Sequence, residues 1–190
     1  PYRRQRQMCI RDSVYLAPSG YSTAGPSDAY VYWAKTFNAG IGSVVPVSPE
    51  PGKGDVYVLM TDGSMPGEEL LQELQDYLTE ERIRPMTDLV TVKKPEAVEF
   101  SIDLTYYINR SDQAKAVTIQ ENVKKAVAEY TTWQTSEIGR DINPDELVQR
   151  IKAAGAKRVE LTAPTFAVVG ETQVAKCTAS AADNGGLEDD

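Results

Sequence analysis

The sequence predicts an α+β fold of two small mixed α/β subdomains, with mainly antiparallel sheets and about four helices. Short apolar runs rich in β-branched residues are interleaved with segments of helical periodicity. Pro- and Gly-rich turns separate some neighbouring runs, which is typical of hairpins rather than of a doubly wound parallel sheet. Residues 97–108 alternate apolar and polar side chains, which predicts a strand with one buried and one wet face.

A domain boundary is expected near Lys94–Pro95, between two strand-like runs. Residues 26–95 form the first predicted α+β subdomain, and residues 96–180 form the second. Residues 1–25 are predicted to be an irregular N-terminal segment, because Pro and Gly recur in them. Residues 181–190 are too polar to pack into a core, so we expect a disordered tail there.

The first predicted element is a helix over Ser27–Phe37, where aromatic and small apolar residues recur every three to four positions. Ser27 or Asp28 can accept the free amide hydrogens of its first turn, and the glycines after Phe37 can end it. Strands are predicted at Ile41–Val47 and Asp55–Met60, since β-branched residues dominate both runs. The Pro- and Gly-rich residues between these runs predict a turn that joins two strands.

A second helix is predicted after Asp62. Asp62 or Ser64 is its expected cap, and Pro66 is expected in the first turn, where no hydrogen bond is lost. The acidic pair Glu68–Glu69 then lies near the positive end of the helix dipole. Pro85 excludes a continuation of this helix.

The second subdomain is predicted to contain the longest strand and the longest helix. A shorter helix is expected to begin at Asn143 as its cap, with Pro144 in the first position, and to stop at Gly155. The predicted elements after Pro85 are a strand over 89–92, a strand over 97–108, a helix over 112–135, a helix over 144–154, and strands over 158–161 and 173–178.

The composition excludes several function classes. The chain has no histidine, which removes Ser-His-Asp and Cys-His nucleophilic pairs and zinc sites built on His. Its 20 basic and 28 acidic residues give a net charge of −8, and we interpret the basic start Pro1–Arg6 as solvated charge rather than an RNA-binding arm. No apolar run approaches the ~20 residues that cross a bilayer. We therefore expect neither nucleic acid nor a membrane as a partner.

The two cysteines, Cys9 and Cys177, are far apart in the sequence and form no Cys-x-x-Cys pattern. A disulfide between them is one alternative. Two free, partly buried thiols in a reducing cytoplasm are the preferred interpretation.

Two glycine-containing segments and three acidic pairs are candidate sites. Pro51–Asp55 lacks the glycine spacing of a phosphate-binding loop, and Gly40–Ser43 lacks the third glycine of a dinucleotide site. Glycosidase chemistry needs two carboxylates that converge, whereas adjacent helical residues point about 100° apart. The acidic pairs Glu68–Glu69, Glu80–Glu81 and Asp189–Asp190 are therefore interpreted as solvated charges.

The remaining candidates also have simpler structural interpretations. Asp55 and Asp62 could bind a cation, but no spacing resembles a calcium loop. The sequence offers three arginines that could clamp an anion, Arg82, Arg84 and Arg140. Salt bridges to nearby acidic residues are the more common role of such arginines. Trp33 and Trp133 could anchor a protein interface, with core packing as the alternative. We predict no catalytic, cofactor-binding or metal-binding residue and no cofactor.

Several segments, taken in order, carry a resemblance to one known family. They are Ala24–Ala34, Ala39–Val47, Pro49–Val58, Arg84–Val92, Ile138–Ile142, Pro144–Ala154, Arg158–Pro164 and Gln173–Ala175. These segments resemble the baseplate J-like family of contractile phages of the Mu and P2 kind. The resemblance covers about residues 25–179 and corresponds to the C-terminal portion of the family.

The resemblance implies a non-enzymatic structural protein of a phage or prophage contractile tail. Such a protein forms wedge and inter-wedge contacts in the inner baseplate ring. The implied partners are other baseplate wedge proteins, copies of the same chain, the central hub and sheath-proximal proteins. The implied location is the virion tail baseplate, after assembly in the bacterial host cytoplasm.

Two other function classes compete with this hypothesis. A small-ligand-binding or regulatory α+β domain would need a concave apolar pocket with converging polar groups. A carboxylate- or metal-dependent hydrolase would need clustered acidic or ligating residues, which the sequence does not indicate.

Overall fold

A computed structural model of the chain describes residues 27–80 and 89–189. The chain divides into two compact units, Pro1–Pro95 and Glu96–Asp190, and each has its own sheet and its own core. The predicted α+β class is confirmed. Each of the two sheets is mixed, however, with a parallel pair of strands beside the expected antiparallel pair.

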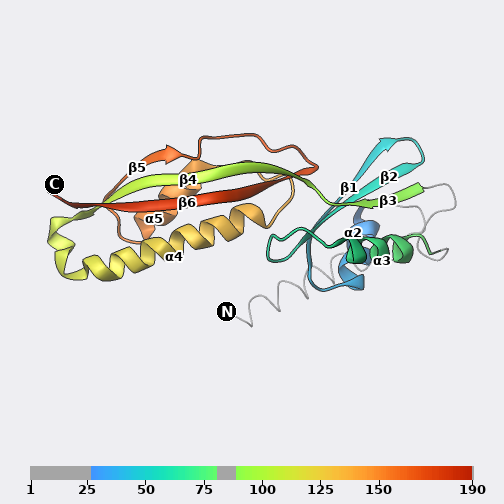
Figure 1. The fold of residues 1–190 in the computed structure, drawn as a ribbon, viewed down its shortest axis with the longest axis horizontal. Coiled ribbons are helices and arrows are strands. Elements are labelled where there is room, and N and C mark those ends of the chain that lie inside the picture. The colour runs from blue at the N-terminus through green and yellow to red at the C-terminus, as the bar shows by residue number, and fades with distance from the viewer. Residues whose placement is uncertain (1–26, 81–88, 190) are drawn as a thin grey trace. The chain divides into compact units, whose positions relative to one another are not determined.

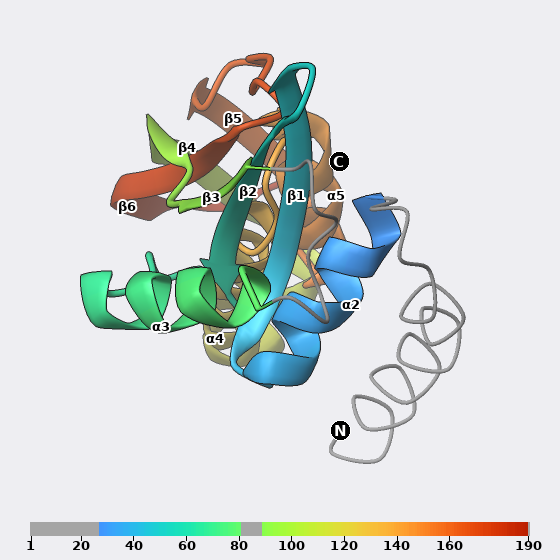
Figure 2. The same cartoon turned by 90° about the vertical axis from the view of Figure 1, so that its right-hand side faces the viewer.

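The first unit places two helices on one face of a three-stranded sheet (Figures 1 and 2). Its elements are α2 (Ser27–Phe37), β1 (Ile41–Glu50), β2 (Lys53–Met60), α3 (Glu68–Leu78) and β3 (Leu89–Lys93). The strand order is β1-β2-β3, with β1 antiparallel and β3 parallel to the central strand. All five elements were predicted, with bounds that differ by a few residues.

The core of the first unit lies between the sheet and both helices. Ala34 of α2, Val56 and Val58 of β2, and Leu74 and Leu78 of α3 are all completely buried. Aromatic rings extend this core, since the Tyr77 ring lies 6.4 Å from Trp33 and 5.1 Å from Phe37 between ring centroids. Trp33 is therefore part of the packing between α2 and α3.

The predicted start of α3 is wrong. The helix begins at Glu68, after an N-cap at Gly67 that makes no side-chain hydrogen bond. Asp62 instead accepts hydrogen bonds from the Ser64 amide at 2.9 Å and the Ser64 hydroxyl at 2.6 Å. These short polar side chains close a local turn directly after β2, and this turn competes with helix capping.

The second unit also packs helices on one face of a three-stranded sheet (Figure 1). Its elements are β4 (Glu96–Asn109), the short 3-10 helix η2 (Arg110–Lys115), α4 (Ala116–Thr135), α5 (Pro144–Ala153), β5 (Arg158–Ala163) and β6 (Gln173–Glu188). The strand order is β5-β4-β6, with β5 antiparallel and β6 parallel to the central strand.

The predicted alternation along β4 is confirmed. Its buried residues are Phe100, Ile102, Leu104, Tyr106 and Ile108. They pack against the inner faces of α4 and α5 in a core cluster of 15 buried residues, compared with nine in the first unit. Among the described residues, the second unit therefore has the larger apolar core.

The two helices of this unit begin differently. The predicted cap of α5 is confirmed, because the Asn143 side chain accepts a hydrogen bond from the Asp145 amide at 3.0 Å and Pro144 opens the helix. The helix expected from Asp112 instead starts as the 3-10 segment η2, and α4 begins at Ala116. Asn109 caps η2, since its side chain accepts a hydrogen bond from the Ser111 amide.

The prediction of a disordered tail over 181–190 is wrong for residues 181–188. Strand β6 continues through them to Glu188 and pairs in parallel with β4. Strand pairing uses main-chain groups, so a polar sequence can extend a sheet when a long neighbouring strand is available. Leu187 packs on the core, and Gly185 passes so close to Tyr107 that a Cβ atom there would lie 2.4 Å from the ring.

Candidate interaction surfaces

The candidate catalytic and ligand-binding residues that the structure describes make separate local contacts. Among the described residues, no group of three or more Cys, Asp or Glu side chains is placed to hold a metal ion. Asp55 forms an ion pair with Lys93 at 2.6 Å, and Glu68 forms one with Lys94 at 2.8 Å. Gly52 has a φ of 79° in the β1–β2 turn, as a hairpin turn requires.

Two further candidate residues, Cys177 and Asp189, lie in the second unit. Cys177 is a free, partly buried thiol, and burial raises its pKa. Asp189 pairs with Arg110 at 2.6 Å. Some of the singled-out residues lie outside the described part of the chain: Cys9, Glu81, Arg82, Arg84 and Asp190.

The shifted pKa values of the described residues all move away from neutrality. The Ser64 hydrogen bonds lower the pKa of Asp62, and the Asp55 hydrogen bond raises that of Lys93. Burial raises the pKa of Tyr130 to about 12. General acid–base catalysts show the opposite tendency, with pKa values tuned toward the working pH.

One hollow of about 190 Å³ lies between the start of α2 and the β1–β2 hairpin. Ser27, Tyr30, Ser48 and Lys53 are among the residues that line it. Binding sites for small organic ligands usually occupy about 300–1,000 Å³. This hollow is small for the rival hypothesis of a small-ligand-binding domain.

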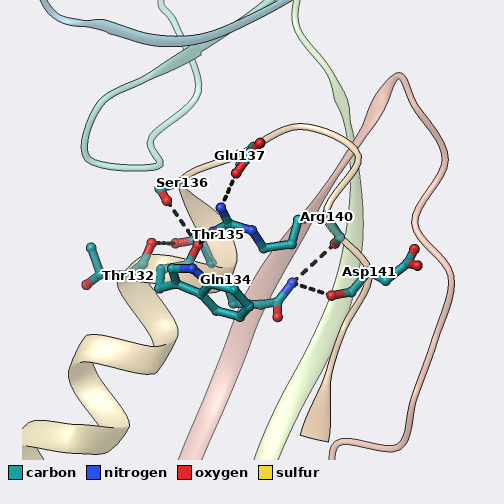
Figure 3. Close-up of polar contacts among 8 residues, drawn as sticks. Thr132, Gln134, Thr135, Ser136, Glu137, Arg140 and Asp141 are labelled. Atoms are coloured by element: carbon teal, nitrogen blue, oxygen red, sulfur yellow. Dashed lines mark hydrogen bonds and ion pairs between the residues drawn. The ribbon is translucent and has the colours of Figure 1, made fainter. Parts of the chain in front are cut away.

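A cluster of polar contacts lies at the end of α4 (Figure 3). The Arg140 guanidinium lies 4.2 Å from the Trp133 ring centroid, and the Arg150 guanidinium lies 5.3 Å from it. Arg140 also donates to the Trp133 carbonyl and pairs with Glu137, while Arg150 pairs with Glu146 at 2.7 Å. Arg140 is therefore held in an internal contact, as its salt-bridge interpretation predicted, and Trp133 packs against the core.

The same cluster contains the completely buried Gln134. Its amide nitrogen donates to the carbonyls of Arg140 and Asp141 at 3.2 and 3.0 Å, while its Oε1 has no partner among the described residues (Figure 3). The Asp141 carboxylate in turn accepts a hydrogen bond from the Val169 amide at 2.9 Å. Gln134 thus fixes residues 140–142, and these hold the segment between β5 and β6.

That segment, residues 164–170, carries an apolar surface and is called the apolar strap here. Phe166 is 61% exposed and Val168 is 73% exposed, while Val169 is buried in the core and Ala167 packs against the core. Two other large apolar side chains are highly exposed among the described residues, Leu89 on β3 and Val117 on α4. The strap therefore presents two exposed apolar residues side by side.

Sequence reasoning missed the apolar strap. The run Thr165–Val169 is apolar and β-branched enough to indicate an extended segment, but it is short and lies between two predicted strands. Its β-bridge to Ile142, through Ala167, is isolated and belongs to no strand. A two-residue bridge leaves no periodic signal in the sequence.

Exposed sheet edges offer a second kind of surface. Each sheet has a central strand and two outer strands, β1 and β3 in the first unit and β5 and β6 in the second. Outer strands can pair with a strand of another chain. No helix among the described residues is long and apolar enough to cross a membrane.

Comparison with known proteins relates both units to one family. The model of the baseplate J-like central domain matches residues 22–94, and that of the baseplate J-like protein C-terminal domain matches residues 100–179. Baseplate protein J of Escherichia phage P2 is 31% identical over 178 residues, which is 93% of this chain and 58% of that protein. The chain thus spans little more than half the length of this relative.

The fold recurs in a solved assembly. A chain in the cryo-EM structure of the anti-feeding prophage baseplate matches 91% of this chain with a TM-score of 0.58. The match covers 41% of that chain at 11% identity, so it shows a shared fold alone.

Proposed function

Because the chain belongs to the baseplate J-like family, we propose that it is a structural, non-catalytic component of a contractile-tail baseplate. The observation that carries this proposal is the match to the P2 baseplate protein across both units, in the same order as the central and C-terminal domains of the family. The arrangement of titratable groups agrees with a structural role, because none of the described carboxylates joins a metal-holding group and the shifted pKa values move away from neutrality.

The proposed partners are other baseplate proteins. Neighbouring wedge proteins, further copies of this chain, the central hub and sheath-proximal proteins fit this role. The proposed location is the tail baseplate of the particle, reached after assembly in the host cytoplasm. Outer strands and an exposed apolar strap are the kinds of surface through which such assemblies form.

Immunoelectron microscopy tests this proposal. Antibodies raised against the 190-residue chain are applied to contractile particles sedimented from induced cells that carry the gene. We expect label at the distal end of the sheath. Particles from cells in which the gene is deleted serve as the control and should show no label. Complete particles without label, together with the protein in the soluble fraction, would overturn the proposal and direct attention to a ligand screen.

A further inference from the structure

We propose that the apolar straps of two copies of this chain pair with each other as antiparallel strands, around a two-fold axis at Ala167. This pairing deepens the proposed function, on which it rests for its biological setting, by naming one surface through which copies meet. In this arrangement Phe166 of each copy lies opposite Val168 of the other. Four observations on the second unit support it.

The first observation is the main-chain geometry of the strap. Ala167 exchanges both of its hydrogen bonds with Ile142, at 2.9 and 3.3 Å. In an antiparallel pair, the residues on either side of such a bonded residue direct their N–H and C=O groups to the opposite edge. No described residue bonds to the main chain of Phe166 or Val168. The strap therefore exposes two donors and two acceptors along one free edge.

The second observation is that this edge is complementary to itself. A two-fold axis at Ala167 creates two equivalent pairs, and in each pair Phe166 of one copy lies opposite Val168 of the other. The two residues of each pair can exchange two main-chain hydrogen bonds. The axis then passes through the pair of Ala167 residues, whose own main-chain groups are already used. All four free groups on each copy find partners in this single register, whereas a shift by one residue leaves them unpaired.

The third observation concerns the side chains. Phe166 and Val168 lie on the same side of the extended strap, because Ala167 and Val169 between and beyond them face the core. In the proposed register each exposed aromatic ring meets an exposed β-branched side chain. Such cross-strand pairs stabilise antiparallel sheets. The pairing also covers part of the exposed apolar surface of Phe166 and Val168, because each ring lies against a side chain of the other copy.

The fourth observation is charge. The chain carries a net charge of −8, so most faces of two copies repel each other. The ten residues Leu161–Gly170 carry no charged side chain. Among the possible occupants of the free edge, a second uncharged strap avoids placing like charges opposite each other.

The interface is small, and this sets the expected affinity. A stable interface usually buries about 800 Å² on each partner, and two apolar side chains per copy supply much less. The isolated chain should therefore dimerise weakly, with a Kd of about 0.1–1 mM. In a ring of fixed subunits the high effective concentration would compensate for this weakness.

Sedimentation equilibrium of the full 190-residue chain, from about 10 μM to 2 mM, tests the pairing. We expect a monomer–dimer equilibrium that Phe166→Asp weakens at least tenfold. Val117→Asp introduces the same charge at another exposed apolar position, 70% exposed on α4, and should leave the equilibrium unchanged. A monomer at every concentration, or a dimer that Phe166→Asp does not weaken, would overturn the proposal and leave the edge to a strand of another protein.

Disulfide trapping tests the register. Both native cysteines are replaced by Ser, and Phe166→Cys and Val168→Cys are made as separate chains. Opposite residues of a bonded antiparallel pair lie about 5.5 Å apart between Cα atoms, within the range of a disulfide. A mixture of the two variants should therefore cross-link at least about tenfold faster than either variant alone. Faster cross-linking of like with like would contradict the register.

These solution measurements do not depend on where the protein lies in a particle. Unlabelled particles with a dimer in solution would overturn the proposed function alone. Labelled particles with a monomeric chain would overturn the strap pairing alone.

Discussion

The two units arrange their sheets alike but complete them by different routes. In both, a central strand has one antiparallel and one parallel neighbour. In the first unit α3 connects the parallel strands β2 and β3, which lie close in the sequence. In the second unit the parallel neighbour of β4 is β6, which pairs with residues more than 70 positions earlier. The second unit therefore depends more on contacts between distant parts of the chain.

The units also differ in what lies beside their apolar cores. Aromatic rings of Trp33, Phe37 and Tyr77 join the helices of the first unit. The second unit buries Gln134, whose amide holds the chain between α4 and α5. Aromatic packing tolerates small shifts, whereas a buried polar group requires a partner of the right kind. We expect the second unit to be more sensitive to changes in polar chemistry.

The largest expected effects come from the two cores. Leu74→Ala in α3 and Ile102→Ala in β4 each truncate a side chain that is at most 1% exposed. Each substitution should lower the stability of its own unit by about 2–5 kcal/mol. Hydrogen exchange read by mass spectrometry should show faster exchange in that unit alone. Leu89→Ala, at a 58% exposed position, is the control. Equal loss of protection in both units would show that they unfold together.

Gln134→Glu tests whether the second unit is sensitive to a change in the chemistry of its buried polar group. The substitution keeps the shape but replaces two hydrogen-bond donations by a carboxylate that faces two carbonyls. An unsatisfied buried polar group costs about 1–3 kcal/mol, and more when it is charged. We expect a loss of about 2–4 kcal/mol at pH 7 in urea unfolding, with partial recovery on acidification as the new carboxyl is protonated.

The control for this substitution is Gln149→Glu, which makes the same chemical change at an exposed position of α5. It should change the stability by no more than about 0.5 kcal/mol. Equal effects of the two substitutions would mean that Gln134 does not hold residues 140–142 in place.

The elements of both units could be predicted because their signals are local. The alternation along β4, the apolar stripe of α3 and the Asn143–Pro144 helix start all lie within short windows of sequence. The start of α3 was misplaced because Asp62 and Ser64 can either cap a helix or close a turn. Local sequence does not decide between these two uses.

The parts that could not be predicted depend on distant partners. The polar residues 181–188 form a strand because β4 offers them a ladder of main-chain groups. The apolar strap is extended because Ile142 bonds to Ala167 and Asp141 bonds to Val169. For the candidate surface, the sequence did not indicate which apolar residues would be exposed.

Removal of residues 183–190 tests the strand at the end of the chain. The truncation deletes the pairing of β6 with the last part of β4 and the packing of Leu187 on the core. Burial of an apolar side chain of this size contributes about 1.5–3 kcal/mol when complete, and Leu187 is only partly buried. We expect the second unit to lose about 1–3 kcal/mol in thermal unfolding. A chain that ends at Glu188 should lose much less, and no difference between the two truncations would support the disordered tail that the sequence predicted.

The smallest expected effect lies on the surface of the second unit, where Arg158 joins β5 to the end of β6. Its guanidinium pairs with Glu188 at 3.0 Å and with Glu160. The Arg158 and Tyr107 hydrogen bonds lower the pKa of Glu160. A lowered folded-state pKa contributes stability above the unfolded-state pKa, and this stability is lost as the pH falls through the folded-state pKa.

Arg158→Gln should therefore raise the pKa of Glu160 toward its ordinary value and weaken the acid dependence of stability in this unit. The side-chain chemical shift of Glu160, followed by NMR from neutral to acid pH, measures this change directly. Arg110→Gln removes another exposed arginine, one that pairs with Asp189 instead, and should leave Glu160 unaffected. Because the Arg158 and Glu160 side chains are 42% and 56% exposed, water screens their pairing, and the effect on stability should be small even where the pKa moves. An unchanged Glu160 pKa in Arg158→Gln would mean that Arg158 does not pair with Glu160 in solution.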